Sequence, residues 1–311
     1  MRALRALTVV PTVVVTATIA FVLLRVIPGD PAALMLGLEA PPEELRQLRH
    51  QLGEDRPIWE QYAAWVGGLA TGRLGESIRF RAPVAALIAE RLPVTLSLAA
   101  AAIAVTVAVA LPLGLLAAVR ARSPLDLGLA AATQAGLAVP NFWVGILLLL
   151  GFSVTLRWLP LQGYAPIRGG AGAWVGHLVL PAVTLGVARA AQLMRFIRGS
   201  VLEELGRDYV RTARGKGLGE RSVLLRHVLR NALIPVLTIA GLQFGFLLGG
   251  AVVVEQVFGL PGMGRLVLQG IFARDLPVVQ GAVVVLAVLV CVLNTLVDLL
   301  YGAVDPRVGA G

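Results

Sequence analysis

The sequence predicts an all-α membrane protein with about six transmembrane helices. It also predicts a periplasmic helical insertion after the first of these helices and a short cytoplasmic helix between the fourth and the fifth. Two observations are compositional: 57% of the 311 residues are hydrophobic and 14% are charged, whereas soluble domains carry about 25% charged residues. The third is that the apolar residues gather in stretches of about 20, the length that crosses a bilayer.

The expected spans follow one another along the whole chain. The first could be a signal peptide, but it lacks a small-residue cleavage site, so we interpret it as a retained helix. The third is interrupted by Pro140 and Asn141, and Pro112, Pro181 and Pro235 are also expected to kink their helices. The six spans are residues 7–27, 96–119, 131–156, 178–197, 233–254 and 278–301.

Basic residues beside the spans orient the chain, because Arg and Lys are enriched in cytoplasmic loops. Arg2 and Arg5 precede the first span, Arg120 and Arg122 follow the second, and the loop after the fourth span is the most basic. With six spans, both termini are predicted to be cytoplasmic. The net charge of +9 therefore indicates contact with membrane lipid, and no nucleic acid partner is expected.

The insertion after the first span is predicted to be a small folded unit. Pro42 can open a helix that Gly53 stops, and Pro57 can open a second one. Aromatic residues on the second helix could either lie at the membrane interface or form the core of the insertion; they are Trp59, Tyr62 and Trp65. The predicted division is 1–27 for the first helix, 28–93 for the insertion and 94–311 for a five-helix core.

The loop between the fourth and fifth spans, about residues 198–231, predicts a helix, a glycine turn and a second helix that begins at Glu220. Apolar Leu218 would lie at the tip of the turn, which suits docking to another protein. The alternative is a basic loop that only holds orientation and touches anionic lipid. The first helix has Leu202, Leu205, Tyr209 and Ala213 at helical spacing, and the glycines are Gly215, Gly217 and Gly219.

The stretch from Asp208 to Gly217 reads Asp-Tyr-Val-Arg-Thr-Ala-Arg-Gly-Lys-Gly. It resembles the loop motif of the membrane subunits of bacterial binding-protein-dependent importers of the ABC class, which contains Glu-Ala-Ala, three residues and then Gly. Ala213 and Gly217 match that register, whereas Arg211 replaces the glutamate. The motif's later Leu-Pro has its nearest counterpart in Ile234-Pro235, at longer spacing. Both departures are usual in the peptide group of these importers.

Other parts of the chain resemble the same group, namely the first (B-type) permease subunit of the dipeptide, oligopeptide and nickel importers. The matching segments occur in order over nearly the whole chain, which makes the resemblance specific. They are residues 27–31 (Ile-Pro-Gly-Asp-Pro), Leu52-Gly53 with Arg56-Pro57, 91–96 (Arg-Leu-Pro-Val-Thr-Leu), 139–143 (Val-Pro-Asn-Phe-Trp), 255–258 (Glu-Gln-Val-Phe) and 261–264 (Pro-Gly-Met-Gly).

The resemblance implies that the cytoplasmic loop is the coupling element, whose short helix sits in a groove of an ATPase subunit. The residues expected to make this contact are Asp208, Tyr209, Arg211, Thr212, Ala213, Lys216, Gly217, Leu218 and Glu220. It also implies a homologous second permease (a heterodimer), two ATPase subunits and an extracytoplasmic binding protein. ATP and Mg would bind the ATPase subunits, and no cofactor is expected on this chain, which lacks a Gly-x-x-x-x-Gly-Lys-Ser/Thr loop.

The translocation path is predicted from polar or kinked positions within the spans, because polar groups in lipid are costly and tend to face the bundle interior. Hydrogen bonding between helices would explain these residues equally well. The candidates are Gln134, Pro140, Asn141, Gln192, Gln243 and Asn294. Glu255 is expected at the outer mouth of the path.

The function expected from these observations is that of a multi-pass permease subunit in the bacterial cytoplasmic membrane, which imports peptides and is not itself an enzyme. Nickel complexes and glutathione are alternative cargoes. An ion-coupled secondary transporter would need buried ionisable residues and inverted repeats, and the spans offer few of the former. A membrane enzyme would need clustered catalytic side chains, and the sequence does not group them.

Overall fold

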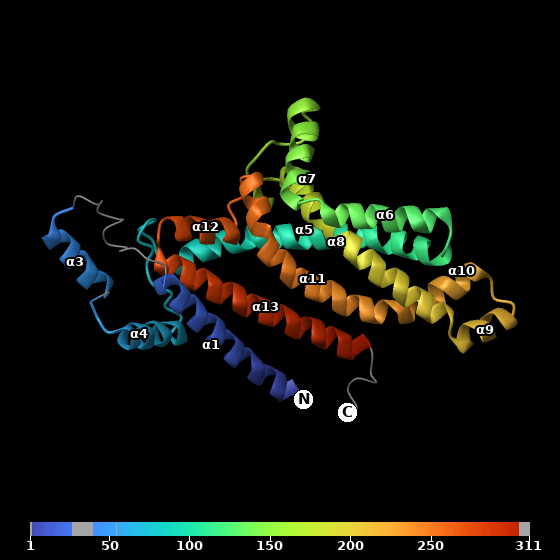
Figure 1. Ribbon diagram of the computed structural model, residues 1–311, viewed down its shortest axis with the longest axis horizontal. Helices are drawn as coiled ribbons and strands as arrows, with labels where there is room; N and C mark the ends of the chain where they lie inside the picture. The colour runs from blue at the N-terminus through green and yellow to red at the C-terminus, as the bar shows by residue number, and fades with distance from the viewer. Residues whose placement is uncertain (1, 27–39, 54, 305–311) are drawn as a thin grey trace. The chain divides into compact units, whose positions relative to one another are not determined.

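A computed structural model of the chain describes residues 2–26, 40–53 and 55–304 (Figure 1). The chain divides into two compact units, which are described separately. Unit 1 comprises Met1–Pro93 and Gly262–Cys291, and unit 2 comprises Val94–Pro261 and Val292–Gly311. Two long helices, α5 (Val84–Val119) and α13 (Leu276–Val304), contribute to both units.

Unit 1 contains the two helices predicted for the insertion. α3 (Pro42–Leu52) begins at a proline and ends at Gly53, whose φ of 69° lets its N–H bond the carbonyls of Arg49 and His50. Such a left-handed residue is the usual end of a helix, and glycine adopts it without a Cβ clash. α4 (Ile58–Ala70) follows Pro57 as predicted. The other elements are α1 (Arg2–Val26), α12 (Met263–Phe272) and the first parts of α5 and α13.

The aromatic residues of α4 divide between the two interpretations left open by the sequence. The rings of Tyr62 and Trp65 lie 5.1 and 5.5 Å from the ring of Phe21 on α1, so these residues form a core. Trp59 is 72% exposed, as expected for a residue at a membrane interface. One helix therefore has a face that packs inside the unit and a face that does not.

The loop that leads into α5 is fixed by a buried carboxylate. Asp275 accepts hydrogen bonds from the Ser77 hydroxyl, from the backbone N–H of Arg79 at 3.0 Å, and from the N–H of Val278 in the first turn of α13. A buried carboxylate needs such donors because it loses its hydration. α5 then starts at Val84, so Pro93, the predicted end of the insertion, lies inside a helix.

Unit 2 is built mainly from long helices. Its elements are the rest of α5 and α13, α6 (Pro124–Ala138), α7 (Asn141–Leu148), the π-helical η1 (Leu149–Thr155), the short η2 (Ile167–Gly169), α8 (Ala171–Leu205), α9 (Asp208–Gly215), α10 (Glu220–Ser222), the π-helical η3 (Val223–Val228) and α11 (Leu229–Val257). Its core lies where α8, α9, η3 and α11 meet, around Ile197, Val201, Val210, Val223 and Val228.

The third predicted span is sharply bent. α6 and the helix that starts at Asn141 meet at 96°, and Pro140 stands at the break. The residue before a proline is driven out of the helical region by its ring, and Val139 has a ψ of 126°. By contrast, α8 and α11 continue through Pro181 and Pro235, so a proline alone does not decide where a helix breaks.

Among the described residues, four helices are long and apolar enough to cross a membrane, and a fifth is added if the bent pair counts as one span. The four are α5, α8, the continuous stretch Glu220–Val257 and α13. The first predicted span falls on α1, whose apolar part, Val10–Leu23, is shorter. The membrane-protein fold is thus confirmed, whereas the number of six spans stays a prediction.

Candidate functional site

The segment between α8 and α11, residues 206–222, has the predicted arrangement of helix, turn and helix and is called the α9 segment here. α9 and α10 lie together at one end of α8 and α11 (Figure 1). One detail differs from the prediction: the four residues expected on one helix, Leu202, Leu205, Tyr209 and Ala213, are divided between two helices. α8 runs to Leu205, beyond Arg198, and the chain turns at Gly206 before α9 starts at Asp208.

The glycine turn is a complete helix-ending motif. The N–H of Gly217 bonds the carbonyl of Arg214 at 2.9 Å, and the N–H of Leu218 bonds the carbonyl of Ala213 at 3.3 Å. This pair of bonds needs a left-handed residue, and Gly217 has a φ of 80°. The backbone of the turn therefore favours glycine at position 217.

α9 packs against the unit through one narrow face. Val210 is fully buried and Ala213 is 7% exposed, and both belong to the core around Ile197 and Val228. The other positions expected to contact a partner are exposed: Asp208, Tyr209, Arg211, Thr212, Lys216, Gly217, Leu218 and Glu220. The small side chain of Ala213 thus packs within the chain, and its expected place at the partner contact stays a prediction.

Polar contacts join α9 to both neighbouring helices. The Tyr209 hydroxyl donates to the carboxylate of Glu204 on α8 and accepts from Nδ2 of Asn231 on α11 at 3.2 Å. Partial burial and the hydrogen bond to Glu204 raise the pKa of Tyr209, so it stays a neutral donor. Ser200 on α8 also donates to the carbonyl of Ala232 on α11 at 2.8 Å. These bonds tie α9 to the ends of α8 and α11.

An ion pair closes the turn itself. Arg214 donates from Nε to Oε1 of Glu220 at 2.7 Å and from Nη2 to Oε2 at 3.1 Å. The bond to Glu220 raises the pKa of Arg214, which remains charged at all relevant pH. Because both side chains are exposed, water and salt screen the pair, so the turn depends more on its backbone bonds than on this pair.

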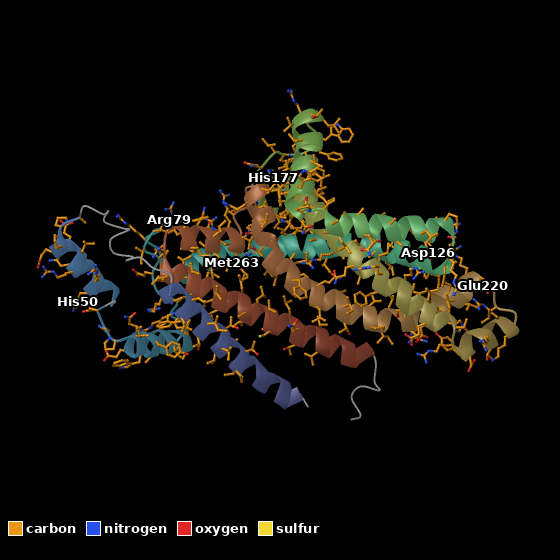
Figure 2. All side chains as sticks on the ribbon, viewed as in Figure 1. His50, Arg79, Asp126, His177, Glu220 and Met263 are labelled. Atoms are coloured by element: carbon orange, nitrogen blue, oxygen red, sulfur yellow. The ribbon has the colours of Figure 1, made fainter. Side chains whose placement is uncertain are left out.

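A second ion pair, which the sequence analysis missed, ties α6 to α8. Arg198 donates from Nε to Oδ1 of Asp126 at 2.7 Å and from Nη2 to Oδ2 at 2.8 Å. Asp126, labelled in Figure 2, is buried and also accepts the backbone N–H of Arg122 at 2.9 Å. In the sequence, Ser123-Pro124 marks a helix start and Asp126 is the only acid in its first turn. This pattern does not identify the partner, because Arg198 is 72 residues away.

The predicted path residues differ in their exposure, and their role in a path stays a prediction. Gln134 and Pro140 are exposed, and Asn141, Gln192 and Asn294 are half-buried. Gln192 lines a cavity of about 530 Å³ between α8 and α11, together with Arg195, Ser200, Glu203, Pro235 and Val236. This cavity adjoins the helix ends that hold α9.

Gln243 on α11 is the most unusual of the path candidates. It is 3% exposed, and neither its Nε2 nor its Oε1 has a hydrogen-bond partner among the described residues. Most buried side-chain polar atoms in folded proteins have a partner, so this amide is held in an unfavourable environment. A change in the spacing of the helices would give it access to water or to another polar group.

Glu255, expected at an outer mouth, is fully buried. Its Oε1 accepts a hydrogen bond from the Thr95 hydroxyl at 2.6 Å. The bond joins α11 to α5 within unit 2. The carboxylate is therefore not presented to another protein in this structure.

Comparison with known proteins gives a consistent result over the whole chain. The family described as binding-protein-dependent transport system inner membrane component matches residues 110–310, and the family of its N-terminal part matches residues 2–99. A putative peptide transport system permease protein of Brucella suis is 45% identical over 96% of this chain and 95% of its own length.

Two further relatives are named for the transport of different cargoes. The glutathione transport system permease protein GsiC of Escherichia coli is 42% identical, and the oligopeptide transport system permease protein AppB of Bacillus subtilis is 40% identical; each comparison covers 98% of this chain and 97% of the relative. A solved structure of the MetNI methionine ABC transporter, in an inward-facing conformation, matches 70% of this chain and 96% of its own with a TM-score of 0.58. At 18% identity this last likeness concerns the fold.

Proposed function

This chain belongs to the family of binding-protein-dependent transport system inner membrane components, and we propose that it is the permease subunit through which an ABC importer moves peptides of the dipeptide and oligopeptide class. It is a multi-pass protein of the inner membrane, and ATP is hydrolysed on a separate subunit. The observation that carries the mechanism is the α9 segment, which exposes a short helix and a rigid glycine turn while remaining tied to two long helices.

The α9 segment is the contact for the ATPase subunit. Its exposed residues form the outward surface, with Leu218 at the tip and Arg211 and Lys216 supplying positive charge. Its buried residues, Val210 and Ala213, join the core of unit 2. A push on the outward surface is therefore carried into the helix bundle rather than absorbed by a flexible loop.

The contacts of α9 indicate which helices would move with it. Tyr209 bonds both Glu204 of α8 and Asn231 of α11, so α9 carries the ends of both helices with it. Closure of an ATPase dimer on ATP would displace α9 and tilt these helices, a hinge-type change between two open states. In such a change the cavity between α8 and α11, which Gln192 lines, would alter its shape.

The complex would contain this chain, a homologous second permease, two ATPase subunits with ATP and Mg, and an extracytoplasmic binding protein. Both termini and the α9 segment would lie in the cytoplasm. This orientation is supported by the basic residues on the α9 segment and beside α1, since such residues collect on the cytoplasmic side. No cofactor is expected on the chain itself.

Peptides are the proposed cargo because relatives at 40 to 45% identity over nearly their full length are named as peptide or oligopeptide permeases. Glutathione is a second candidate, since a relative named for it is as similar as these are. Nickel complexes stay a possibility that only the resemblance noted in the sequence supports. The binding protein of the system would select among these cargoes.

The test is reconstitution. The chain is co-expressed with its neighbouring genes, purified in mild detergent, and placed in proteoliposomes with enclosed ATP and a labelled dipeptide outside. The proposal expects an ATPase and a second permease to copurify and uptake to require ATP. Uptake that proceeds without an ATPase and collapses with an ionophore would instead establish an ion-coupled transporter.

A further inference from the structure

Unit 1 contains a cavity of about 340 Å³ that the proposed transport mechanism does not use. Its size falls within the range of about 300–1,000 Å³ that is typical of small-molecule sites. It is formed by the ends of α1 and α3, by α4 and by the start of α13. Its polar walls are supplied by Arg25, His50, Arg56, Gln61, Trp65 and Gln280.

Two residues on these walls carry a buried hydrogen-bond donor that has no partner among the described residues. The donors are Nε2 of Gln280, whose residue is 4% exposed, and the indole N–H of Trp65. Burying a donor without an acceptor is unfavourable because the donor has given up its bonds to water. Two such donors on residues beside one cavity favour a ligand that brings acceptor oxygens.

The charge of the cavity is also one-sided. Among the described lining residues are the guanidinium groups of Arg25 and Arg56, and none of those residues is an acid. His50, labelled in Figure 2, also lines the cavity, and its Nε2 lies 3.9 Å from the carboxylate of Asp55. An oxyanion would meet charge-assisted donors here, which are stronger than neutral ones.

The donors are held in place before any ligand arrives. Arg25 donates to Oε1 of Gln61 from Nε at 3.2 Å and from Nη2 at 2.7 Å, and its guanidinium lies 3.6 Å from the centre of the Phe21 ring. Nε2 of Gln61 donates to the backbone carbonyl of Arg56 at 2.8 Å. Trp65 packs on the same Phe21 ring. Because these side chains are already held in place, they lose little conformational entropy on binding a ligand, and this favours affinity.

The surroundings indicate where the ligand comes from. Arg25 follows directly on the apolar part of α1, Val10–Leu23, whose Val15 and Leu23 are exposed in this chain, as are Ile58 and Trp59 of α4. Apolar exposed helix faces with a tryptophan at their end mark the boundary between hydrocarbon and headgroups. The cavity therefore lies beside the part of unit 1 suited to lipid.

We propose that this cavity binds the phosphate of an anionic phospholipid such as phosphatidylglycerol. The phosphate oxygens would accept from Trp65, Gln280 and the two arginines. The zwitterionic lipids would bind less well, because their ammonium group would be brought close to Arg25 and Arg56. The proposal is independent of the cargo and of the ATPase contact.

The experiment is native mass spectrometry of the complete transporter, stripped of lipid in detergent and titrated with dioleoylphosphatidylglycerol or dioleoylphosphatidylcholine. Trp65→Phe keeps the ring and removes the N–H, and Arg56→Gln removes one charge. The matched controls are Trp59→Phe, on the exposed part of the same helix, and Arg46→Gln, on the exposed face of α3.

We expect phosphatidylglycerol to bind in preference to phosphatidylcholine, with affinity about 2- to 10-fold weaker in Trp65→Phe and about 10-fold weaker or more in Arg56→Gln. Both control variants should bind as the unaltered protein does. Equal retention in all variants, or equal loss in the controls, would overturn the site.

Two further arms identify the source of the anion. Inorganic phosphate and the dipeptide Ala-Ala are added as competitors at rising concentration. The lipid assignment is wrong if either competitor displaces phosphatidylglycerol at a concentration no higher than that of the lipid. This displacement must occur in the unaltered protein and be absent in Trp65→Phe and Arg56→Gln. If neither displaces it, the assignment stands.

Discussion

Replacing Gly217 tests whether the α9 segment must keep its glycine turn to couple transport to ATP. Gly217 has a φ of 80°, and a Cβ built on it meets no atom of the chain within 4 Å. A side chain there therefore causes no collision inside the protein, and its cost is that of a left-handed backbone, roughly 1–2 kcal/mol. An energy of that size lowers the equilibrium constant between the native turn and its alternatives by roughly 5- to 30-fold.

The change to make first is Gly217→Ala, with Gly219→Ala as the matched control. Gly219 lies two residues away, has a φ of −63°, and is equally open to an added Cβ. ATP-dependent dipeptide uptake in proteoliposomes should fall by up to the same roughly 5- to 30-fold factor in Gly217→Ala and remain near normal in Gly219→Ala. Gly217→Glu should abolish uptake and release the ATPase in a pull-down, while the protein remains inserted.

Gly217→Asn separates two reasons for a defect. Asparagine tolerates the left-handed conformation better than alanine, so it restores the turn but still places a side chain on the outward surface. Recovery of uptake would mean that turn geometry alone matters, and a persistent defect would mean that the partner approaches closely. Normal uptake in both Gly217→Ala and Gly217→Glu would refute the coupling assignment altogether.

Three further predictions concern the helices that α9 would move. Asp126→Asn should lower the melting temperature of the protein in detergent. The decrease should be smaller when Arg198 is already replaced by Met, because the ion pair is then absent. Additive decreases would show that Asp126 and Arg198 do not stabilise the protein as a pair. Gly241→Ala should destabilise the protein by about 1–3 kcal/mol, because the added Cβ would lie 2.3 Å from the side chain of Val297 on α13. Gly249→Ala is the control, because its Cβ would meet no atom within 4 Å. Equal melting temperatures of the two variants would contradict this packing. Gln243→Leu should raise stability by about 1–3 kcal/mol, since it removes a buried unpartnered amide, and should reduce uptake if that amide serves the path; lower stability would mean that the amide has a partner in the folded state.

The features that the sequence predicted well are those that depend on residues close together in the chain. The turn at Gly217 and the end of α3 at Gly53 depend on backbone bonds spanning five residues or fewer, so the glycines themselves carry the signal. The break at Pro140 was marked in the same way, because a proline acts on the residue beside it. The membrane-protein class followed from composition, which folding does not change.

What the sequence could not predict depended on contacts between distant segments. Nothing in the sequence links Asp126 to Arg198, 72 residues away, and their pairing appears only when α6 packs on α8. The inward position of Ala213 was likewise hidden, because the small residue matched a motif associated with a partner. The break at Gly206 was hidden as well: Leu202 and Leu205 belong to α8 and Tyr209 and Ala213 to α9, because helical spacing alone does not show where a helix is interrupted.

The two kinds of contact at α9 explain how a short exposed helix could move a large bundle. Backbone bonds make the turn stiff, and Val210 with Ala213 makes its inner face part of the core of unit 2. The bonds of Tyr209 to Glu204 and Asn231 then link the ends of α8 and α11. Gln243, whose amide has no hydrogen-bond partner among the described residues, lies on the same α11, and its unfavourable burial is a reason for the helix to leave this state when α9 is displaced. The energy needed at α9 would then be lowered by strain already present within the span.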